Sequence, residues 1–145
     1  MSNNLQKSYY KGVICSIKQK ITKGKANIAK PILLLTILNM IDRGELLGNR
    51  IVYNDLLKDR YRAILDEYTK DLTPLRYPFY YMRNDGFYHI KGQTDLKTPS
   101  EGYILKNVSY AYLDPELWDL LQDPQTRDEF REAIISHYLK PDNEK

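Results

Sequence analysis

The chain has few of the side chains that hydrolytic and redox chemistry require. It contains a single cysteine, Cys15, and two histidines, His89 and His137. One cysteine excludes a disulfide framework and a cysteine-rich zinc site, and two histidines are too few for the usual clusters of metal ligands. No histidine stands beside Cys15 in the sequence, so nucleophilic catalysis is not supported either. We therefore expect no catalytic residue, no metal and no cofactor, and predict that the chain is not an enzyme.

Long apolar segments and phosphate-binding glycine loops are also missing. The longest apolar run, residues 32–38, is far too short to span a bilayer, and the amino terminus lacks the layout of a signal peptide. None of the glycines is followed by the lysine and serine or threonine that end a phosphate loop. A length of 145 residues is typical of one domain. We expect a cytoplasmic, single-domain protein without a membrane partner.

Acidic side chains are absent from the first 30 residues, which carry seven lysines. Residues 114–145 show the opposite balance, with nine acids against four bases. A lysine-rich arm without acids attracts polyphosphates through the release of condensed counterions. Lys23 and Lys25, in a basic loop, are therefore predicted to contact DNA phosphates. The alternative, that these lysines only keep the protein soluble, stays open.

The segment 75–90 is rich in aromatic side chains, with seven rings if His89 is counted. Asn84-Asp85-Gly86 between β-favouring runs predicts a hairpin turn. Arg76 and Arg83 flank the rings, and flat π faces beside cations on a ribbon suit bases, sugars and phosphates. Arg76 and Arg83 are predicted phosphate contacts, and so is His89, although a solvated strand histidine is at least as good an interpretation.

The remaining elements follow from apolar periodicity and from turn residues. Apolar residues at every fourth position from Leu5 to Ile21 predict a helix, and Asp-Pro pairs typically cap and open helices. The expected elements are a helix over residues 5–21, a buried helix over 31–41, a short strand over 49–53, a helix over 55–69 capped by Asn54, the aromatic hairpin, a polar loop over 92–102, a strand over 103–108, and helices over 115–121 and 124–139.

These elements predict an α+β fold: a mainly helical single domain with a small antiparallel hairpin or sheet, in an element order similar to that of a winged helix. We expect one DNA-recognition domain over residues 1–145. Its parts are a basic helix and loop (1–30), a helix-strand-helix-hairpin core (31–112) and two carboxyl-terminal helices (113–139). In a winged helix, the helix over 55–69 enters the DNA groove and the hairpin is the wing.

Several short motifs, in order, resemble the DNA sulfur-binding domain of McrA-type, phosphorothioate-dependent restriction endonucleases and related amino-terminal regions of HNH nucleases. They extend over about residues 29–139. The motifs are Lys30-Pro31-Ile32-Leu33-Leu34-Leu35, Tyr77-Pro78-Phe79, Asn84-Asp85-Gly86-Phe87-Tyr88, Leu113-Asp114-Pro115-Glu116-Leu117-Trp118 and Ile134-Ile135-Ser136-His137-Tyr138.

The resemblance implies a shallow apolar pocket for the sulfur of a modified DNA backbone. Tyr77 and Pro78 would form this pocket, and Lys30 would be its basic partner. Sulfur is larger, softer and less hydrated than oxygen, so a proline ring and an aromatic edge favour it, while a lysine neutralises the phosphate. Tyr81 is counted with Lys30, Tyr77 and Pro78 among the predicted pocket residues, but it stands where we expect a small residue, and Ala29 stands where the family leads us to expect a histidine. These departures bear on the choice of sulfur over oxygen and not on DNA binding.

The leading interpretation is a non-catalytic module that binds double-stranded DNA, with phosphorothioate-modified DNA as the expected target, in a bacterial restriction or defence system. The HNH nuclease that usually follows is not part of these 145 residues. The chain is therefore either the recognition part of a longer nuclease or a stand-alone reader. Two alternatives remain: a protein-interaction domain that uses its tyrosines as a hot-spot patch, and a winged-helix transcription factor that reads bases with Arg60 and Arg62.

Overall fold

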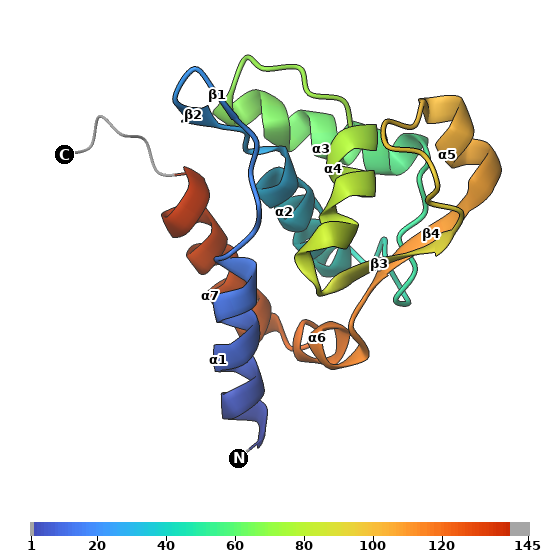
Figure 1. Cartoon of the computed structure of the whole chain (residues 1–145). Helices are drawn as coiled ribbons and strands as arrows, with labels where there is room; N and C mark the ends of the chain where they lie inside the picture. Colours follow the sequence, from blue (N-terminus) through green and yellow to red (C-terminus); the bar gives the residue numbers. More distant parts are fainter. Residues whose placement is uncertain (1, 140–145) are drawn as a thin grey trace.

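The fold is built around one apolar helix, α2 (Ala29–Asp42), which runs through the centre of the molecule (Figure 1). Ile32, Leu33 and Ile37 have no exposed surface, and helices α3, α4 and α7 pack against α2. Pro31 is tolerated because it lies in the first turn, where its missing N–H removes no helical hydrogen bond. The prediction of a buried central helix over 31–41 is confirmed.

The computed structural model describes residues 2–139, so the last six residues of the expected domain lie outside the described part. The order of the elements is α1 (Ser2–Ile14), β1 (Ile21–Thr22), β2 (Lys25–Ala26), α2 (Ala29–Asp42), α3 (Asp55–Tyr68), α4 (Arg76–Tyr81), a 3-10 turn η1 (Met82–Asp85), β3 (Tyr88–Gly92), α5 (Glu101–Asn107), β4 (Val108–Leu113), α6 (Pro115–Leu120), α7 (Pro124–Ile134) and a π-helical turn η2 (Ile135–Leu139).

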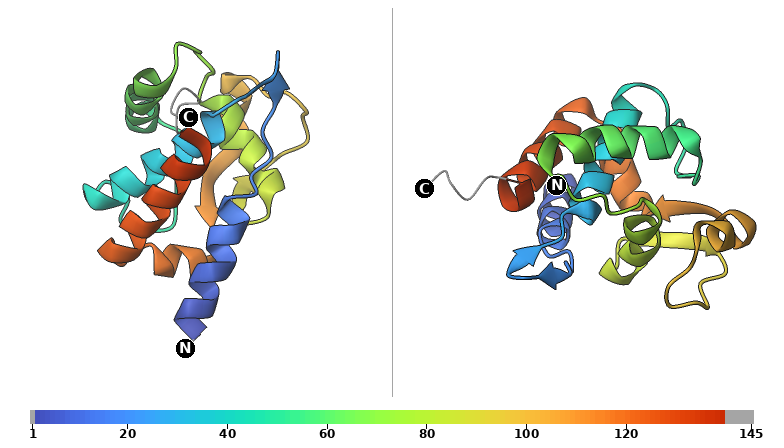
Figure 2. Two further views of the ribbon diagram at one scale, coloured as in Figure 1. Left: turned by 90° about the vertical axis from the view of Figure 1, so that its left-hand side faces the viewer. Right: turned by 90° about the horizontal axis from the view of Figure 1, so that it is seen from above.

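The helices and two small antiparallel sheets are arranged on opposite sides of α2. Helices α1, α6 and α7 lie together on one side of it, and α4, α5 and the β3–β4 sheet lie on another (Figures 1 and 2). The predicted fold class, a mainly helical α+β domain with small antiparallel sheets, is confirmed. No helix in residues 2–139 is long and apolar enough to cross a bilayer.

Two of the predicted helix caps are present and one is not. The side chain of Asn54 accepts the Leu57 N–H at 2.9 Å, and that of Asp123 accepts the Thr126 N–H at 2.9 Å. Each side-chain oxygen thus accepts a hydrogen bond from a backbone N–H that has no partner within the first turn of the helix. Asp114 precedes α6 as expected, but its carboxylate does not cap the helix. It instead accepts the Tyr10 hydroxyl at 2.8 Å and contacts His89.

The first helix is shorter than predicted and buries a different face. It ends at Ile14, and Leu5 and Tyr9 of the expected apolar stripe are 74% and 63% exposed. Tyr10 and Ile14 are buried instead, where α1 packs on α6 and α7. A four-residue spacing drifts around a helix of 3.6 residues per turn, so the stripe cannot stay on one face.

The aromatic hairpin predicted at 75–90 is wrong. Residues 76–81 form α4, and η1 follows directly. Pro78 lies in the first turn of α4, where it is tolerated, whereas it has no N–H to donate to a strand ladder. Gly86 does adopt a left-handed conformation, with φ of 90°, but Asp85 does not have the positive φ that a type I′ hairpin turn also requires. Gly86 therefore ends a helical segment.

The main sheet pairs β3 with β4, and Ile51 adds an isolated bridge to Ala111 on the other edge of β4. The strand predicted over 103–108 is wrong, because Glu101–Asn107 is helix α5 and the strand begins at Val108. Gly92 ends β3 where the register shifts. A Cβ at this position would lie 2.3 Å from the Asn107 carbonyl oxygen, so only glycine permits this close approach.

Candidate nucleic-acid interface

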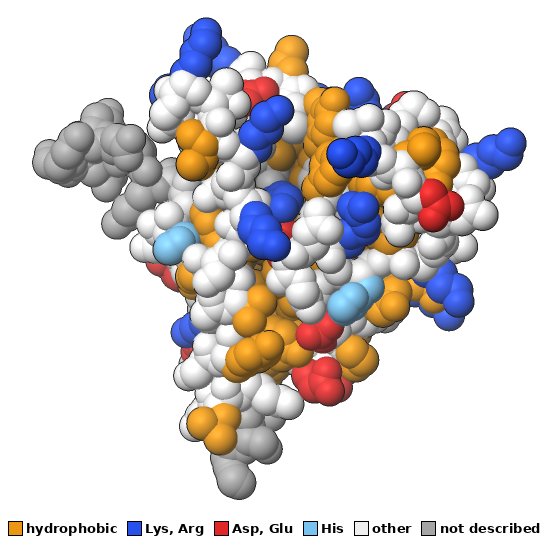
Figure 3. Space-filling view, in the orientation of Figure 1, with side chains coloured by type: hydrophobic (Ala, Val, Ile, Leu, Met, Phe, Trp, Pro, Cys, Tyr) orange, Lys and Arg blue, Asp and Glu red, His pale blue; other side chains and the backbone are white. Residues whose placement is uncertain are grey.

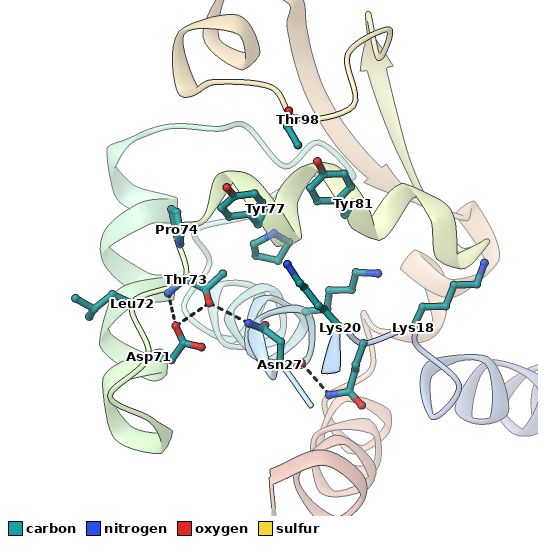
Figure 4. A pocket seen from close by; sticks show the side chains of 13 residues that line it. Lys18, Lys20, Asn27, Asp71, Leu72, Thr73, Pro74, Tyr77, Tyr81 and Thr98 are labelled. Atoms are coloured by element: carbon teal, nitrogen blue, oxygen red, sulfur yellow. Dashed lines mark hydrogen bonds between the residues drawn. The ribbon is translucent and has the colours of Figure 1, made fainter. Parts of the chain in front are cut away.

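A pocket of about 870 Å³ opens between the segment before β1, the start of α2, the turn before α4, and α4 itself. Figure 4 shows Tyr77 and Tyr81 on α4 along one wall, with Lys20 across from them and Thr98 on a loop beyond. Lys18 extends away from the rings, and its Nζ donates to the Asn84 carbonyl at 3.5 Å. Segments distant in the sequence thus meet here. The lining residues are Lys18, Gln19, Lys20, Asn27, Lys30, Asp71, Leu72, Thr73, Pro74, Tyr77, Pro78, Tyr81 and Thr98.

The apolar wall of the pocket is made by α4. The rings of Tyr77 and Tyr81, one helical turn apart, stack with centroids 6.0 Å apart and an interplanar angle of 13°. Pro78, which follows Tyr77 in the helix, is buried, and Tyr77 itself is 37% exposed. The four residues predicted from the resemblance, Lys30, Tyr77, Pro78 and Tyr81, all line this one pocket. Their role in binding remains a prediction.

The basic partner in the pocket, Lys30, is held by a buried carboxylate. Its Nζ lies 2.8 Å from Oδ2 of Asp85, and the two side chains are 16% and 2% exposed. Oδ1 of Asp85 accepts the backbone N–H of Lys18 at 2.8 Å. Asp85 therefore joins the start of α2 to the segment that leads into β1, and it fixes where the Lys30 ammonium stands.

Two neighbouring tyrosines fasten the loop that carries Thr98. Tyr80 donates its hydroxyl to the Leu96 carbonyl at 2.6 Å, and Tyr81 donates to the next carbonyl, that of Lys97. Burial raises the pKa of the Tyr80 hydroxyl, so it stays a protonated donor. The loop is thereby attached to α4 at the far rim of the pocket.

The predicted phosphate contacts lie around the pocket rather than in it. Lys23 and Lys25 are exposed on the β1–β2 hairpin, next to the lysines that line the pocket. The Arg76 guanidinium lies 4.9 Å from the Tyr77 ring, and Arg83 lies 4.1 Å from the Tyr80 ring and donates to the Tyr80 carbonyl at 3.1 Å. The predicted proximity of arginines and aromatic rings is thus present, on a helix instead of a ribbon.

His89 lies on β3, where it contacts Asp114 and Tyr112. Its Nε2 is 2.5 Å from Asp114 Oδ1, and its ring centroid is 5.2 Å from that of Tyr112. It does not line the pocket. A phosphate contact by His89 stays a prediction that the pocket geometry does not support.

Sequence reasoning missed several residues of the pocket. Lys18 and Lys20 were noted only as part of a basic arm, because the expected helix over 5–21 hid the extended segment they occupy. Asn27 donates to the Thr73 hydroxyl at 3.0 Å and accepts the Ala29 N–H at 2.8 Å, which connects the start of α2 to the turn before α4. No sequence signal pairs these distant residues.

Charge is divided across the face that carries the pocket. Figure 3 shows many lysine and arginine side chains, with a few acidic ones among them, over the upper part of this face, and acidic side chains lower down, over α6. Such a division orients a polyanion toward the upper part. Within residues 2–139, no group of three or more His, Cys, Asp or Glu side chains could hold a metal ion.

Of the two arginines proposed to read bases, Arg60 on α3 is engaged within the fold, with two hydrogen bonds to Glu45 at 2.9 and 2.5 Å. Arg62 lies 4.0 Å from the exposed Asp66, and its Nη1 has no hydrogen-bond partner among the described residues. Helix α3 also packs against α2. The pairing with Glu45 makes Arg60 less available for groove recognition.

The family comparison agrees with the features of this pocket. The model of the ScoMcrA-like DNA sulfur-binding domain matches residues 11–145, so the chain belongs to this family. The membership predicted from short motifs is confirmed, and it supports a DNA-binding module. A comparison with curated proteins found no match.

Solved structures show the same fold. The sulfur-binding domain of SprMcrA, complexed with phosphorothioated DNA, matches with a TM-score of 0.74 at 17% identity, over 97% of this chain and 90% of that one. The sulfur-binding domain of ScoMcrA, also complexed with phosphorothioated DNA, matches with a TM-score of 0.70 at 16% identity, over 93% and 91%. At these identities, the likeness establishes the fold and leaves individual residue roles open.

Proposed function

We propose that this chain is a non-catalytic module that binds double-stranded DNA and holds a phosphorothioate of its backbone in the pocket on α4. One observation carries the proposal: the Tyr77-Pro78 wall and the Lys30 ammonium line the same pocket. Family membership and the DNA complexes of the two solved relatives support it. The context is restriction or defence, as for McrA-type proteins.

The chemistry of the pocket suits an anion that carries one poorly hydrated atom. Stacked rings and proline carbons cannot replace the hydrogen bonds that water makes to a phosphate oxygen, but they cost sulfur little. Lys18, Lys20 and Lys30 supply positive charge that both kinds of backbone require. The wall is therefore expected to distinguish the two atoms, and the lysines to hold either phosphate.

Tyr77→Ala tests this division of labour. Its affinity for a phosphorothioate duplex should fall by about 1–3 kcal/mol, the scale of one aromatic contact to nucleic acid, and its affinity for the unmodified duplex should fall much less. Lys30→Ala should weaken both. Fluorescence anisotropy on two otherwise identical duplexes measures the difference.

A matched control is available in Tyr68→Ala. Tyr68 lies at the end of α3, and it is 38% exposed against 37% for Tyr77. It does not line the pocket, so its removal should leave both affinities unchanged. Equal losses on the two duplexes for Tyr77→Ala, with the circular dichroism spectrum intact, would mean that the ring does not recognise sulfur.

The non-catalytic part of the proposal has a separate test. The purified chain should leave plasmid DNA uncut in magnesium, manganese or zinc, because a hydrolytic metal centre needs several converging ligands. Reproducible metal-dependent cleavage that disappears in His89→Ala would contradict it.

A further inference from the structure

Asp85 carries a buried carboxylate behind the pocket, and the proposed function assigns it no role. The side chain of Asp85 is 2% exposed and does not line the pocket, yet it contacts two segments that do. Burying a charge is unfavourable unless the charge is paired and hydrogen-bonded. Both oxygens of Asp85 satisfy this condition, one with the Lys30 ammonium and the other with the Lys18 amide, each at 2.8 Å.

The element that carries Asp85 is itself fixed. Asp85 ends η1, directly after α4, and the next side chain but one, Phe87, is fully buried. The Phe87 carbonyl accepts the Asp114 N–H at 2.9 Å. The Asp85 carboxylate is therefore held in place, and it fixes the positions of Lys18 and Lys30 relative to the aromatic wall of the pocket.

We infer that Asp85 is a positioning residue for phosphate recognition: it holds Lys30 and the backbone of Lys18 at the distance from Tyr77 and Pro78 that a phosphorothioate requires. This inference rests on the proposed function, because it assumes that the pocket receives the DNA backbone. It assigns no DNA contact to Asp85 itself.

The change in DNA affinity that this inference predicts is opposite to the change that charge alone would cause. Removing a negative charge from a DNA-binding protein should strengthen binding to any duplex, since the phosphates repel carboxylates. If Asp85 acts by position, Asp85→Asn should instead lose affinity for both duplexes, because the released Lys30 no longer holds the phosphate beside the wall. We expect a loss of roughly tenfold or more, the scale of a hydrogen bond to a charged group.

Asp59→Asn is the matched charge control. Asp59 is exposed on α3 and does not line the pocket. The substitution removes the same charge without touching Lys30. It should leave affinity for both duplexes equal to or higher than in the wild type.

The experiment measures both duplexes with the wild type, Asp85→Asn and Asp59→Asn. A loss of affinity in Asp85→Asn beside no loss in Asp59→Asn supports positioning. Equal or higher affinity in both variants overturns it and leaves the proposed function intact, whereas a wild type that binds neither duplex refutes the proposed function itself.

A measurement on the unaltered protein covers the case in which Asp85→Asn fails to fold. Hydrogen exchange should show the Lys18 amide protected, although it belongs to no strand, because Asp85 accepts its hydrogen bond. Free exchange of the Lys18 amide would show that the connection is absent in solution and would overturn the inference.

Discussion

Tyr81 offers the sharpest test of how the far wall of the pocket is built. Its ring stacks on Tyr77, and its hydroxyl donates to the Lys97 carbonyl on the loop that carries Thr98. Tyr81→Phe keeps the ring and removes only the hydroxyl. Tyr81→Ala removes both. The two variants therefore separate the wall from the attachment of the loop.

The magnitudes follow from these two contacts. A net hydrogen bond contributes about 0.5–1.5 kcal/mol, and an exposed one lies in the lower half of that range, so Tyr81→Phe should weaken phosphorothioate binding by about two- to fivefold. Tyr81→Ala also loses an aromatic stack, worth about 0.5–1.5 kcal/mol more, and should bind more weakly still.

Anisotropy titrations give the affinities, and hydrogen exchange at Lys97 and Thr98 reports whether the loop has loosened. Tyr9→Phe, an exposed hydroxyl on α1 away from the pocket, is the control. Wild-type affinity together with unchanged exchange in Tyr81→Phe would refute the attachment. Tighter phosphorothioate binding by Tyr81→Ala would show that the ring obstructs the pocket instead of forming its wall.

Two further outcomes are expected. Replacing Lys23 and Lys25 with alanine should weaken binding to every duplex and flatten the slope of log affinity against log salt by roughly one for each lost phosphate contact, with the thermal midpoint unchanged; an unaltered slope would mean that these lysines serve solubility alone. The hydrogen bonds from Thr126 hold the pKa of Asp123 below its ordinary value of 3.8, so its contribution to stability is present above that pH and is lost as the pH falls through the lower folded-state pKa. Asp123→Ala should therefore melt below the wild type at pH 7 by an amount that shrinks in acid, and Asp123→Asn, which still caps α7, should melt close to the wild type at pH 7.

The elements that local chemistry determines were predicted well. Asn54 and Asp123 cap their helices because a side-chain oxygen next to free amides needs no distant partner. The apolar run after Pro31 was predicted as a buried helix, and it lies in α2. Lys30, Tyr77 and Pro78, brought together by the resemblance, line one pocket, although 46 positions of sequence separate Lys30 from the α4 start at Arg76. That this pocket binds DNA stays a prediction.

The errors arose where tertiary contacts outweigh local signals. Asn84-Asp85-Gly86 has the composition of a hairpin turn, but Asp85 is used for a buried ion pair with a lysine on α2. Asp114 has the position of a helix cap, but its carboxylate bonds to Tyr10 and His89. The sequence of a turn motif is the same whether its carboxylate faces solvent or binds a distant cation, so the sequence alone could not predict these contacts.

The central claim is that the pocket recognises a sulfur-bearing phosphate, and comparing one phosphorothioate duplex with its unmodified twin tests it most directly. The wild-type chain should bind the modified duplex at least about fourfold more tightly, which corresponds to burying one methylene-sized apolar group, about 0.8 kcal/mol. Both affinities should fall steeply with salt, because the lysines around the pocket neutralise phosphate charges that both duplexes carry. Equal affinities for the two duplexes across the salt series would contradict the claim.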